Sequence, residues 1–382
     1  MRSYDAIIAG GGLIGSAIAL ELALNDLRVA LFDAQEPGRE ASWASAGILS
    51  PAPENPGMIS MVPIGKASLA MYPGFIAEVE ERSGFPTGYR AKGTVEALFS
   101  RHAREELNTI IALHRGLGLK AEAISAKEAR EMEPALSEEI EAAVLRPQEA
   151  SVDNRLLTRA LIEAAKKSGA EIHVAAAVQG IWRERSQCLG AVVNGEYISA
   201  KHTIVATGSF SSQIAGVEKY APVRPAKGQM VSLRCDAVKI ERVLWSERIY
   251  VVPRNDGRIL CGATVEHVGF DKTVTASGVH ANLDAAIELA PVLGSACIEE
   301  TWAGLRPDTP DHLPILGPTE LEGLLIATGH FRSGVLLTPI TAKLIGEFVI
   351  GKTPSVDWEK FSPMRFQAAQ ESARVSGAPH FR

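Results

Sequence analysis

The chain has 382 residues, a net charge of −6, 46% apolar residues and 22% charged residues. This composition is typical of a soluble globular protein with a large core, and the length predicts two domains. The acidic balance argues against a protein that binds nucleic acid or an anionic membrane surface.

The four cysteines, Cys188, Cys235, Cys261 and Cys297, are scattered without C-x-x-C spacing. We therefore expect reduced thiols, no disulfide framework and no metal site. The first apolar run ends in three glycines, so it predicts a strand rather than a signal peptide. No apolar stretch approaches the roughly 18 residues of a membrane-spanning helix. The expected compartment is the cytoplasm, with no membrane partner.

The N-terminal segment carries a dinucleotide-binding pattern. Residues 5–9 predict a buried parallel strand, 16–23 a helix and 28–32 a second strand that ends in Asp33. Between the first strand and the helix stands GGGLIG at 10–15, which has the form G-x-G-x-x-G. The order strand, glycine loop, helix, strand and acid predicts dinucleotide binding, although FAD and NAD share this pattern.

Each part of the pattern has a physical role. Gly10 permits a tight turn, Gly12 lets the backbone approach a pyrophosphate, and Gly15 allows the helix to pack closely on the strand. The N-terminus of the helix offers N–H groups and a positive dipole end to phosphates. Asp33 is expected to accept hydrogen bonds from the adenosine ribose.

The next part of the chain alternates loops and helices. The stretch 34–57 is rich in small residues, especially at 41–47, and we expect it to contact the cofactor. Apolar spacing predicts helices over 66–84 and 103–117 and a strand over 94–100, with His114 at a helix surface. Ser125 and Glu128 predict a capping box.

Residues 151–209 predict a second α/β unit. Asp153 can cap a helix over 155–167, and a strand follows at 172–174. A hairpin over 179–197 leads to a buried strand over 203–209, whose glycine turn belongs at the ligand-binding end of a parallel sheet.

The strand-like runs 230–233, 249–253 and 258–261 predict an antiparallel sheet, and 282–289 predicts a helix. A strand at 324–327, a turn at 329–334 and a long apolar helix over 335–350 then restore the α/β pattern. The sequence therefore predicts two interleaved domains in an α/β fold that is α+β overall.

At this point several stretches together resemble the D-amino acid oxidase superfamily of FAD-dependent oxidoreductases, and most closely its glycine oxidases of thiamine biosynthesis. The resemblance rests on the glycine loop with Asp33, SAGIL at 45–49, ATG at 206–208, YVVPR at 250–254, GATVE at 262–266, WAGLRP at 302–307 and GHFRSG at 329–334. It implies a Rossmann-like FAD-binding domain (1–84, 142–219 and 305–382) interleaved with an antiparallel-sheet substrate-binding domain (85–141 and 220–304).

The resemblance implies oxidation of an amine next to a carboxylate, by hydride transfer to flavin N5. The imine is then hydrolysed to an oxo acid, and oxygen reoxidises the flavin to give hydrogen peroxide. Arg306 matches the arginine that pairs with the substrate carboxylate, and Tyr250 matches the tyrosine beside it. Arg332 matches a residue at the rim of the active site.

The residues expected around FAD come from the motifs and the resemblance together. They are Gly10, Gly12, Leu13, Ile14, Gly15, Asp33, Ala34, Ala41, Ser42, Ala46, Gly47, Ile48, Val178, Ala206, Gly208, Phe331, Arg332, Ser333, Gly334, Val335 and Leu336. Asp33 replaces the Glu of many members, Ile48 stands where one branch has Met, and Arg248 where one branch has His. Because no cysteine follows Cys297, FAD is expected to be non-covalent.

Hydride transfer needs no base if the amine arrives neutral. His330 and Glu266 are the titratable residues within the specific motifs, and both are interpreted as structural. The helix expected to begin near Gly334 would direct its N-terminus toward the negative charge that develops on reduced flavin.

Alternatives stay open at this point. The first is a dehydrogenase of the same fold that passes electrons to a quinone or carrier protein, and others are an NAD-dependent enzyme or a tRNA-modifying flavoprotein. The acidic charge argues against the last. The expected partners are oxygen and a small amino acid or amine; glycine, sarcosine, D-proline and D-alanine are not distinguished, and association into a homo-oligomer is left open.

Overall fold

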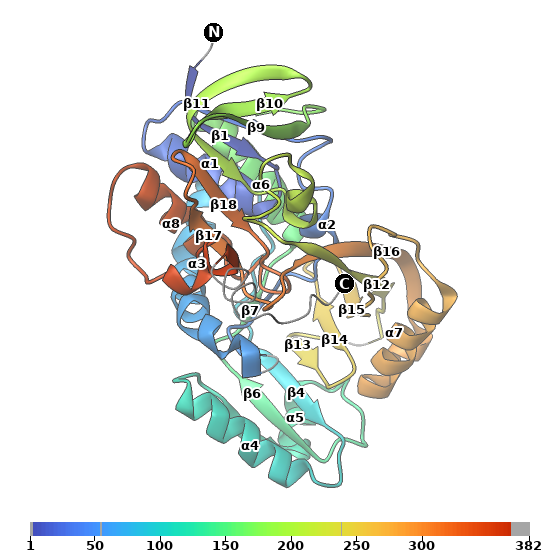
Figure 1. Ribbon diagram of the computed structural model, residues 1–382. Helices are drawn as coiled ribbons and strands as arrows, with labels where there is room; N and C mark the ends of the chain where they lie inside the picture. Colours follow the sequence, from blue (N-terminus) through green and yellow to red (C-terminus); the bar gives the residue numbers. More distant parts are fainter. Residues whose placement is uncertain (1–2, 54–55, 238, 368–382) are drawn as a thin grey trace, which may run out of the picture.

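The computed structural model describes residues 3–53, 56–237 and 239–367, and it contains two large sheets that lie end to end (Figure 1). Residues 1–2, 54–55 and 368–382, which the domain prediction assigns to the FAD-binding domain, lie outside the described residues.

The first sheet is built mainly of parallel strands. In spatial order it contains β17 (Ile315–Pro318), β18 (Leu324–Thr328), β11 (Glu196–Val205), β1 (Ser3–Ala9), β2 (Val29–Phe32) and β8 (Glu171–His173), with β10 (Gln187–Val193) and β9 (Val178–Glu184) branching from β11. The strands from β18 to β8 all run parallel. This arrangement is the Rossmann-like unit that the N-terminal pattern predicts.

Helices cover one face of this sheet. They are α1 (Leu13–Leu24), α3 (Val62–Ser83), α6 (Asn154–Lys167) and α8 (Thr338–Val349), and α1 packs against both α6 and α8. Ile8 and Leu31 lie in that layer, whereas Ile7 and Phe32 belong to the core on the opposite face, under the β9–β10 hairpin. Strands buried on both faces explain the continuous apolar runs in the sequence.

The second sheet is mostly antiparallel. In order it contains β16 (Cys297–Asp308), β12 (Arg224–Arg234), β15 (Arg258–Gly262), β14 (Tyr250–Pro253), β13 (Val243–Trp245), β4 (Thr94–Leu98), β6 (Ala142–Arg146) and β5 (Glu122–Ser125). A short ladder joins β3 (Ile48–Leu49) to β7 (Ala150–Ser151).

The two faces of the second sheet have different neighbours. One face packs under α5 (Ala126–Met132) and α7 (Ala276–Leu289), while α4 (Ala103–Gly116) covers β4 and β6 near the far end. The opposite face, with Met230 and Trp302, packs against α2 (Ala41–Ala44). The loop beside the cofactor motif is therefore pressed against the second sheet.

Several element boundaries differ from the predictions. The helix predicted from Val335 begins at Thr338, because Pro339 lacks an N–H and fits only the first turn of a helix. The strand predicted at 203–209 is the end of β11, and it stops at Val205. Strand β6 lies in the second sheet, although residues 142–146 were assigned to the FAD-binding domain, and β16 crosses the predicted boundary at 305. The division into domains stays a prediction.

Both predicted helix caps are confirmed. Ser125 and Glu128 form a reciprocal capping box at α5, and the Asp153 carboxylate accepts from the backbone N–H groups of Arg155 and Leu156 at α6. Within the described ranges, none of the helices combines the length and the apolar character needed to cross a bilayer.

Gly15 offers a direct test of the packing of α1. A Cβ at this position would overlap the carbonyl oxygen of Gly10 and lie 3.1 Å from its carbon, so backbone would have to move. We expect Gly15→Ala to lower the free energy of unfolding by about 1–3 kcal/mol, as measured by urea denaturation. Gly74→Ala is the matched control, because Gly74 is exposed in α3 with open space around it. It should gain up to about 1 kcal/mol, and equal losses in both variants would contradict this account.

Candidate cofactor and substrate site

The glycine loop has the geometry of a phosphate cradle. Gly10 has φ +99°, and its N–H donates to the carbonyl of Phe32 at 2.8 Å. A Cβ at Gly10 would lie 2.6 Å from the carbonyl oxygen of Ala206. Glycine is therefore required at this turn, where β1, β2 and β11 end side by side.

The N-terminus of α1 has donors available. The N–H of Leu13 donates to Ser42 Oγ at 2.9 Å, but within the described residues no hydrogen bond joins the N–H of Ile14 or Gly15 to an acceptor. These groups and the helix dipole suit the pyrophosphate of a dinucleotide. The residues present therefore fit FAD.

Asp33 lies at the end of β2, as expected. Its carboxylate accepts from the backbone N–H of Gly11 at 2.7 Å and of Gln35 at 3.0 Å. Burial raises the pKa of Asp33, and these two hydrogen bonds oppose that shift. The carbonyl of Asp33 also accepts from Ala176 N–H at 2.8 Å, which brings the chain before Val178 alongside.

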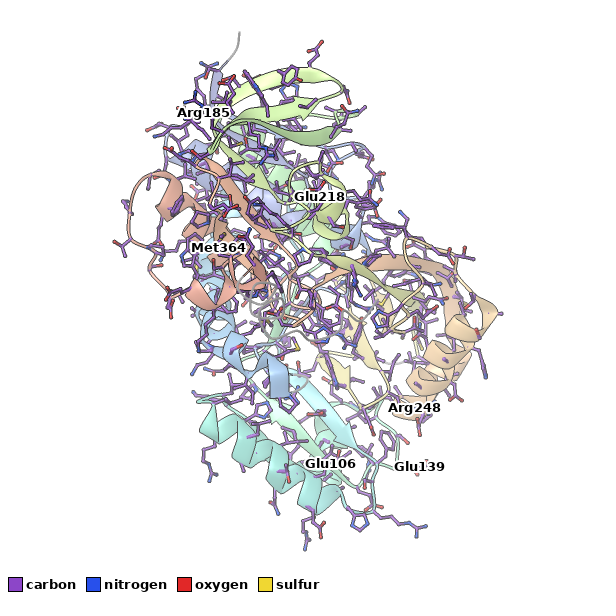
Figure 2. The ribbon with its side chains drawn as sticks, in the orientation of Figure 1. Glu106, Glu139, Arg185, Glu218, Arg248 and Met364 are labelled. Carbon is purple, nitrogen blue, oxygen red and sulfur yellow. The ribbon has the colours of Figure 1, made fainter. Side chains whose placement is uncertain are left out.

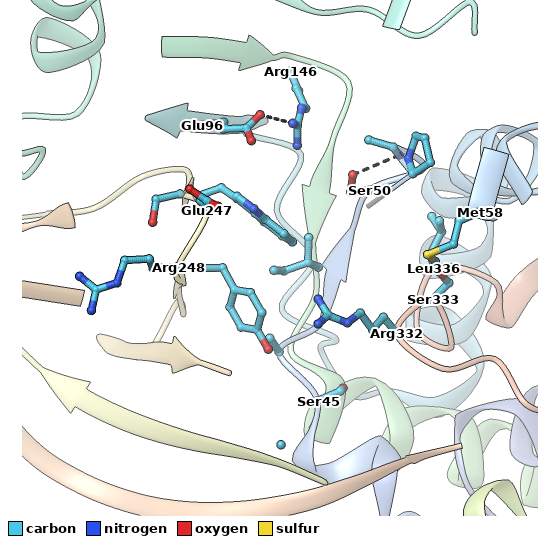
Figure 3. Close-up of a pocket in the computed structure, with 18 of the residues that line it drawn as sticks. Ser45, Ser50, Met58, Glu96, Arg146, Glu247, Arg248, Arg332, Ser333 and Leu336 are labelled. Atoms are coloured by element: carbon cyan, nitrogen blue, oxygen red, sulfur yellow. Dashed lines mark hydrogen bonds and ion pairs between the residues drawn. The ribbon is translucent and has the colours of Figure 1, made fainter. Parts of the chain in front are cut away.

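A cavity of about 810 Å³ begins beside this loop and extends along the second sheet (Figure 3). Ser45 marks one end, and the ion pair of Glu96 and Arg146 lies toward the other. Arg332 points into the cavity, whereas the Arg248 guanidinium points away from it. Its walls thus come from the cofactor loop, the face of the second sheet and the turn before α8.

Arg306 projects into this cavity from β16. Its Nη1 donates to the carbonyls of Thr264 at 3.1 Å and Lys227 at 3.4 Å. Within the described residues its Nε and Nη2 make no hydrogen bond and the guanidinium forms no ion pair. Two donors therefore remain for an anionic ligand, in the fork geometry that suits a carboxylate.

Tyr250 and Arg332 also line the cavity, and their roles toward the substrate stay predictions. The Tyr250 hydroxyl donates to Met230 Sδ at 3.5 Å, and its ring lies 5.5 Å from that of Trp245. The Arg332 guanidinium lies 5.6 Å from the Phe331 ring centroid. The three predicted catalytic side chains thus share one space.

The predicted cofactor residues fall into two groups. Those that line the cavity are Ala41, Ala46, Gly47, Ile48, Phe331, Arg332, Ser333, Val335 and Leu336. The others lie outside it, around the strand ends of the first sheet or in the turn before α8: Gly10, Gly12, Leu13, Ile14, Gly15, Asp33, Ala34, Ser42, Val178, Ala206, Gly208 and Gly334. Their contacts with FAD stay predictions. None of the four cysteines lines the cavity, which fits non-covalent FAD.

The prediction that His114 lies at a helix surface is wrong. Its side chain is buried and lines the cavity, because α4 turns this face toward β4 and β6. Burial lowers the pKa of His114, and its Nδ1 lies 2.9 Å from the carbonyl oxygen of Ile110.

His330 and Glu266 have structural partners, as interpreted from the sequence. His330 is buried, its Nε2 lies 3.1 Å from Thr341 Oγ1, and burial lowers its pKa to about 3. Glu266 pairs with the buried Lys227 at 3.1 Å. Burial favours a higher pKa for Glu266, but hydrogen bonds from Thr264, Gln229 and Lys227 outweigh it and lower the pKa.

Sequence reasoning missed Arg254, which anchors the cofactor loop. Its buried guanidinium donates to the carbonyls of Val152 at 3.0 Å and Ala46 at 2.9 Å, and to Asn154 Oδ1 at 2.9 Å. The sequence signal that could have identified Arg254 was its position in the YVVPR motif at 250–254.

Arg155 forms a second anchor that the sequence did not reveal. It lies 3.7 Å from the Trp43 ring centroid and 4.8 Å from that of Trp302, and it pairs with Glu300 at 2.9 Å. Other cavity residues missed include Gly228, Gly304 and Arg248. Figure 2 shows Arg248 at the outer side of the second sheet, where it pairs with Asp284 and Glu288 of α7.

The comparisons with known proteins identify the family of the chain. The profile of the FAD dependent oxidoreductase family matches residues 5–348. The chain belongs to this family, and its cofactor is FAD. Among the described residues, no cluster of three or more side chains suits a metal ion.

Individual relatives can also be compared with this chain. Glycine oxidase from Geobacillus kaustophilus is 34% identical over 95% of this chain and 97% of its own length. Its crystal structure superposes with a TM-score of 0.91, at 33% identity over 96% of this chain and 99% of that chain. The bifunctional protein ThiO/ThiG from Trichormus variabilis is 35% identical over 95% of this chain and 55% of its own length. The chain thus spans about half the length of the bifunctional relatives it matches.

Arg254 yields a prediction about both stability and cofactor binding. In Arg254→Met the three oxygen acceptors lose their donor, while Asp153 keeps Arg258 at 2.8 Å. We expect a loss of about 3–5 kcal/mol in the free energy of unfolding, and a lower FAD content because the loop at Ala46 is released. Urea denaturation and flavin absorbance measure the two effects.

Arg258→Met is the matched control. Arg258 lies on the neighbouring strand and is partly exposed, so its loss should cost at most about 1 kcal/mol and spare FAD. Full FAD content in Arg254→Met would contradict the anchoring role.

Proposed function

We propose that the protein oxidises glycine or another small amino acid or secondary amine, such as sarcosine, D-alanine or D-proline. The oxo acid, ammonia or amine, and hydrogen peroxide are the products, with oxygen and water consumed. The observation that carries the proposal is the Arg306 guanidinium, which faces the cavity with two donors available. Relatives named glycine oxidase support it.

Arg306 binds the substrate carboxylate in this proposal. The nearby Glu266 carboxylate is already engaged by Lys227 and Gln229, so it does not compete for the guanidinium. Tyr250 lies on the same sheet face and limits the space next to the bound carboxylate. Together they orient the Cα–H bond toward the loop containing Ala46 and Gly47.

The loop containing Ala46 and Gly47 would hold FAD, which would supply the hydride acceptor for the Cα–H bond. Within the described part of the chain, no general base lies at this end of the cavity: His330 is neutral above its pKa of about 3 and bonds to Thr341. Glu96 lies on β4 at the distant end (Figure 3), and His114 lies on α4, which covers β4 and β6. The substrate amine therefore reacts in its neutral form, and the residues act by placement.

A substrate panel tests the proposal. With the carboxylate held at Arg306 and the hydrogen aimed at the hydride acceptor, two enantiomers differ by the exchange of amine and side chain. Tyr250 limits the space beside the carboxylate and so makes these two positions unequal, which favours one enantiomer. We expect turnover of glycine, sarcosine and D-alanine with one peroxide per amine, and little turnover of L-alanine. Greater turnover of L-alanine would overturn the assignment, and reduction of a quinone without peroxide would favour the dehydrogenase alternative.

Arg306→Ala separates a substrate-binding arginine from a structural one. Loss of a desolvated charge partner costs on the order of 2–5 kcal/mol. The value of kcat/KM for D-alanine should then fall roughly 30- to 4,000-fold, while FAD content and Tm change little. An amine without a carboxylate should lose much less. Loss of flavin or stability with KM unchanged would show that Arg306 is structural.

A further inference from the structure

Two glycines lie opposite each other on the sheet face that carries Arg306. In the β12–β16 ladder Gly228 pairs with Gly304, and Ala226 pairs with Arg306. Because side chains alternate between the faces of a strand, positions 228, 304 and 306 share one face. Gly228, Gly304 and Arg306 all line the cavity.

The guanidinium occupies the space that a side chain at position 228 would need. A Cβ built on Gly228 would lie within 2.6 Å of Nη1, Nη2 and Cζ of Arg306. Since all three atoms are near that point, a side chain at position 228 would displace the guanidinium.

We propose that Gly228 is a positioning residue for binding of the substrate carboxylate. The missing side chain lets the guanidinium lie against β12, with Nη1 held by the carbonyls of Thr264 and Lys227. The inference rests on the proposed function, because it assumes that Arg306 binds substrate.

We expect a methyl group at position 228 to displace the Arg306 side chain without disturbing the fold. Gly228 has no left-handed φ, so alanine fits its backbone. The atoms that must move are the far end of a flexible side chain. Gly304 differs, because a Cβ there would overlap the Cβ of Ala44 in α2 and press on the cofactor loop.

Steady-state kinetics on the FAD-loaded Gly228→Ala variant tests the inference. A displacement of about 1 Å at a binding group can cost on the order of 100-fold in rate. We expect kcat/KM for D-alanine to fall about 10- to 100-fold, with unchanged FAD content and Tm. Acetate serves as a second probe: its dissociation constant, read from the flavin absorption spectrum, should rise by a similar factor.

The double variant Gly228→Ala/Arg306→Ala tests whether Gly228 acts through the Arg306 guanidinium. If Gly228 acts only through the guanidinium, adding Gly228→Ala to Arg306→Ala should change neither kcat/KM nor acetate binding further. Gly74→Ala is the control: Gly74 is exposed in α3 with open space around it and does not line the cavity, so the kinetics of this variant should match the wild type.

Wild-type kinetics in Gly228→Ala, with Arg306→Ala impaired, would overturn the positioning role alone. A further loss in the double variant would also overturn it, because Gly228 would then act without the arginine. Wild-type kinetics and acetate binding in Arg306→Ala itself would overturn the proposed function along with this inference.

Discussion

The buried guanidinium of Arg254 is the constraint on which the site depends. It donates to the carbonyls of Ala46 and Val152 and to Asn154 Oδ1, which belong to the cofactor loop and the start of α6. Burial lowers its pKa to about 10, so the group stays charged at neutral pH. A buried charge must keep its partners. This one residue of the second sheet therefore holds the loop and helix of the first unit in place.

Close backbone packing also fixes the position of the cofactor loop relative to the second sheet. Gly47 has φ +70°, and a Cβ there would overlap the carbonyl oxygen of Val152. Trp302 donates from Nε1 to the carbonyl of Ala44 at 3.0 Å, so β16 is tied to α2 just before the loop. The strand that carries Arg306 and the loop expected beside the flavin are thus fixed relative to each other. The contact between β16 and the loop therefore sets the distance between the carboxylate site and the hydride acceptor.

Local patterns in the sequence predicted the Rossmann-like unit and the caps at Ser125 and Asp153, because glycine spacing, apolar runs and capping oxygens act over a few residues. The start of α8 was misplaced, since a turn and an apolar helix look alike before Pro339. His114 was misjudged because burial of α4 depends on β4 and β6, which are distant in sequence. Arg254 and Gly228 were missed for the same reason. Their roles exist only across the sheet, where no local period marks them.

The arginines that line the cavity differ in whether they pair with an acidic side chain. At the distant end Arg146 pairs with Glu96, and Arg248 pairs with Asp284 and Glu288. Arg306 instead meets only backbone carbonyls within the described residues, and the neighbouring Glu266 is held by Lys227. Carbonyl dipoles steady a guanidinium without neutralising it. A carboxylate that enters the cavity therefore gains more at Arg306 than at Arg146 or Arg248, because those two arginines already have an acidic partner.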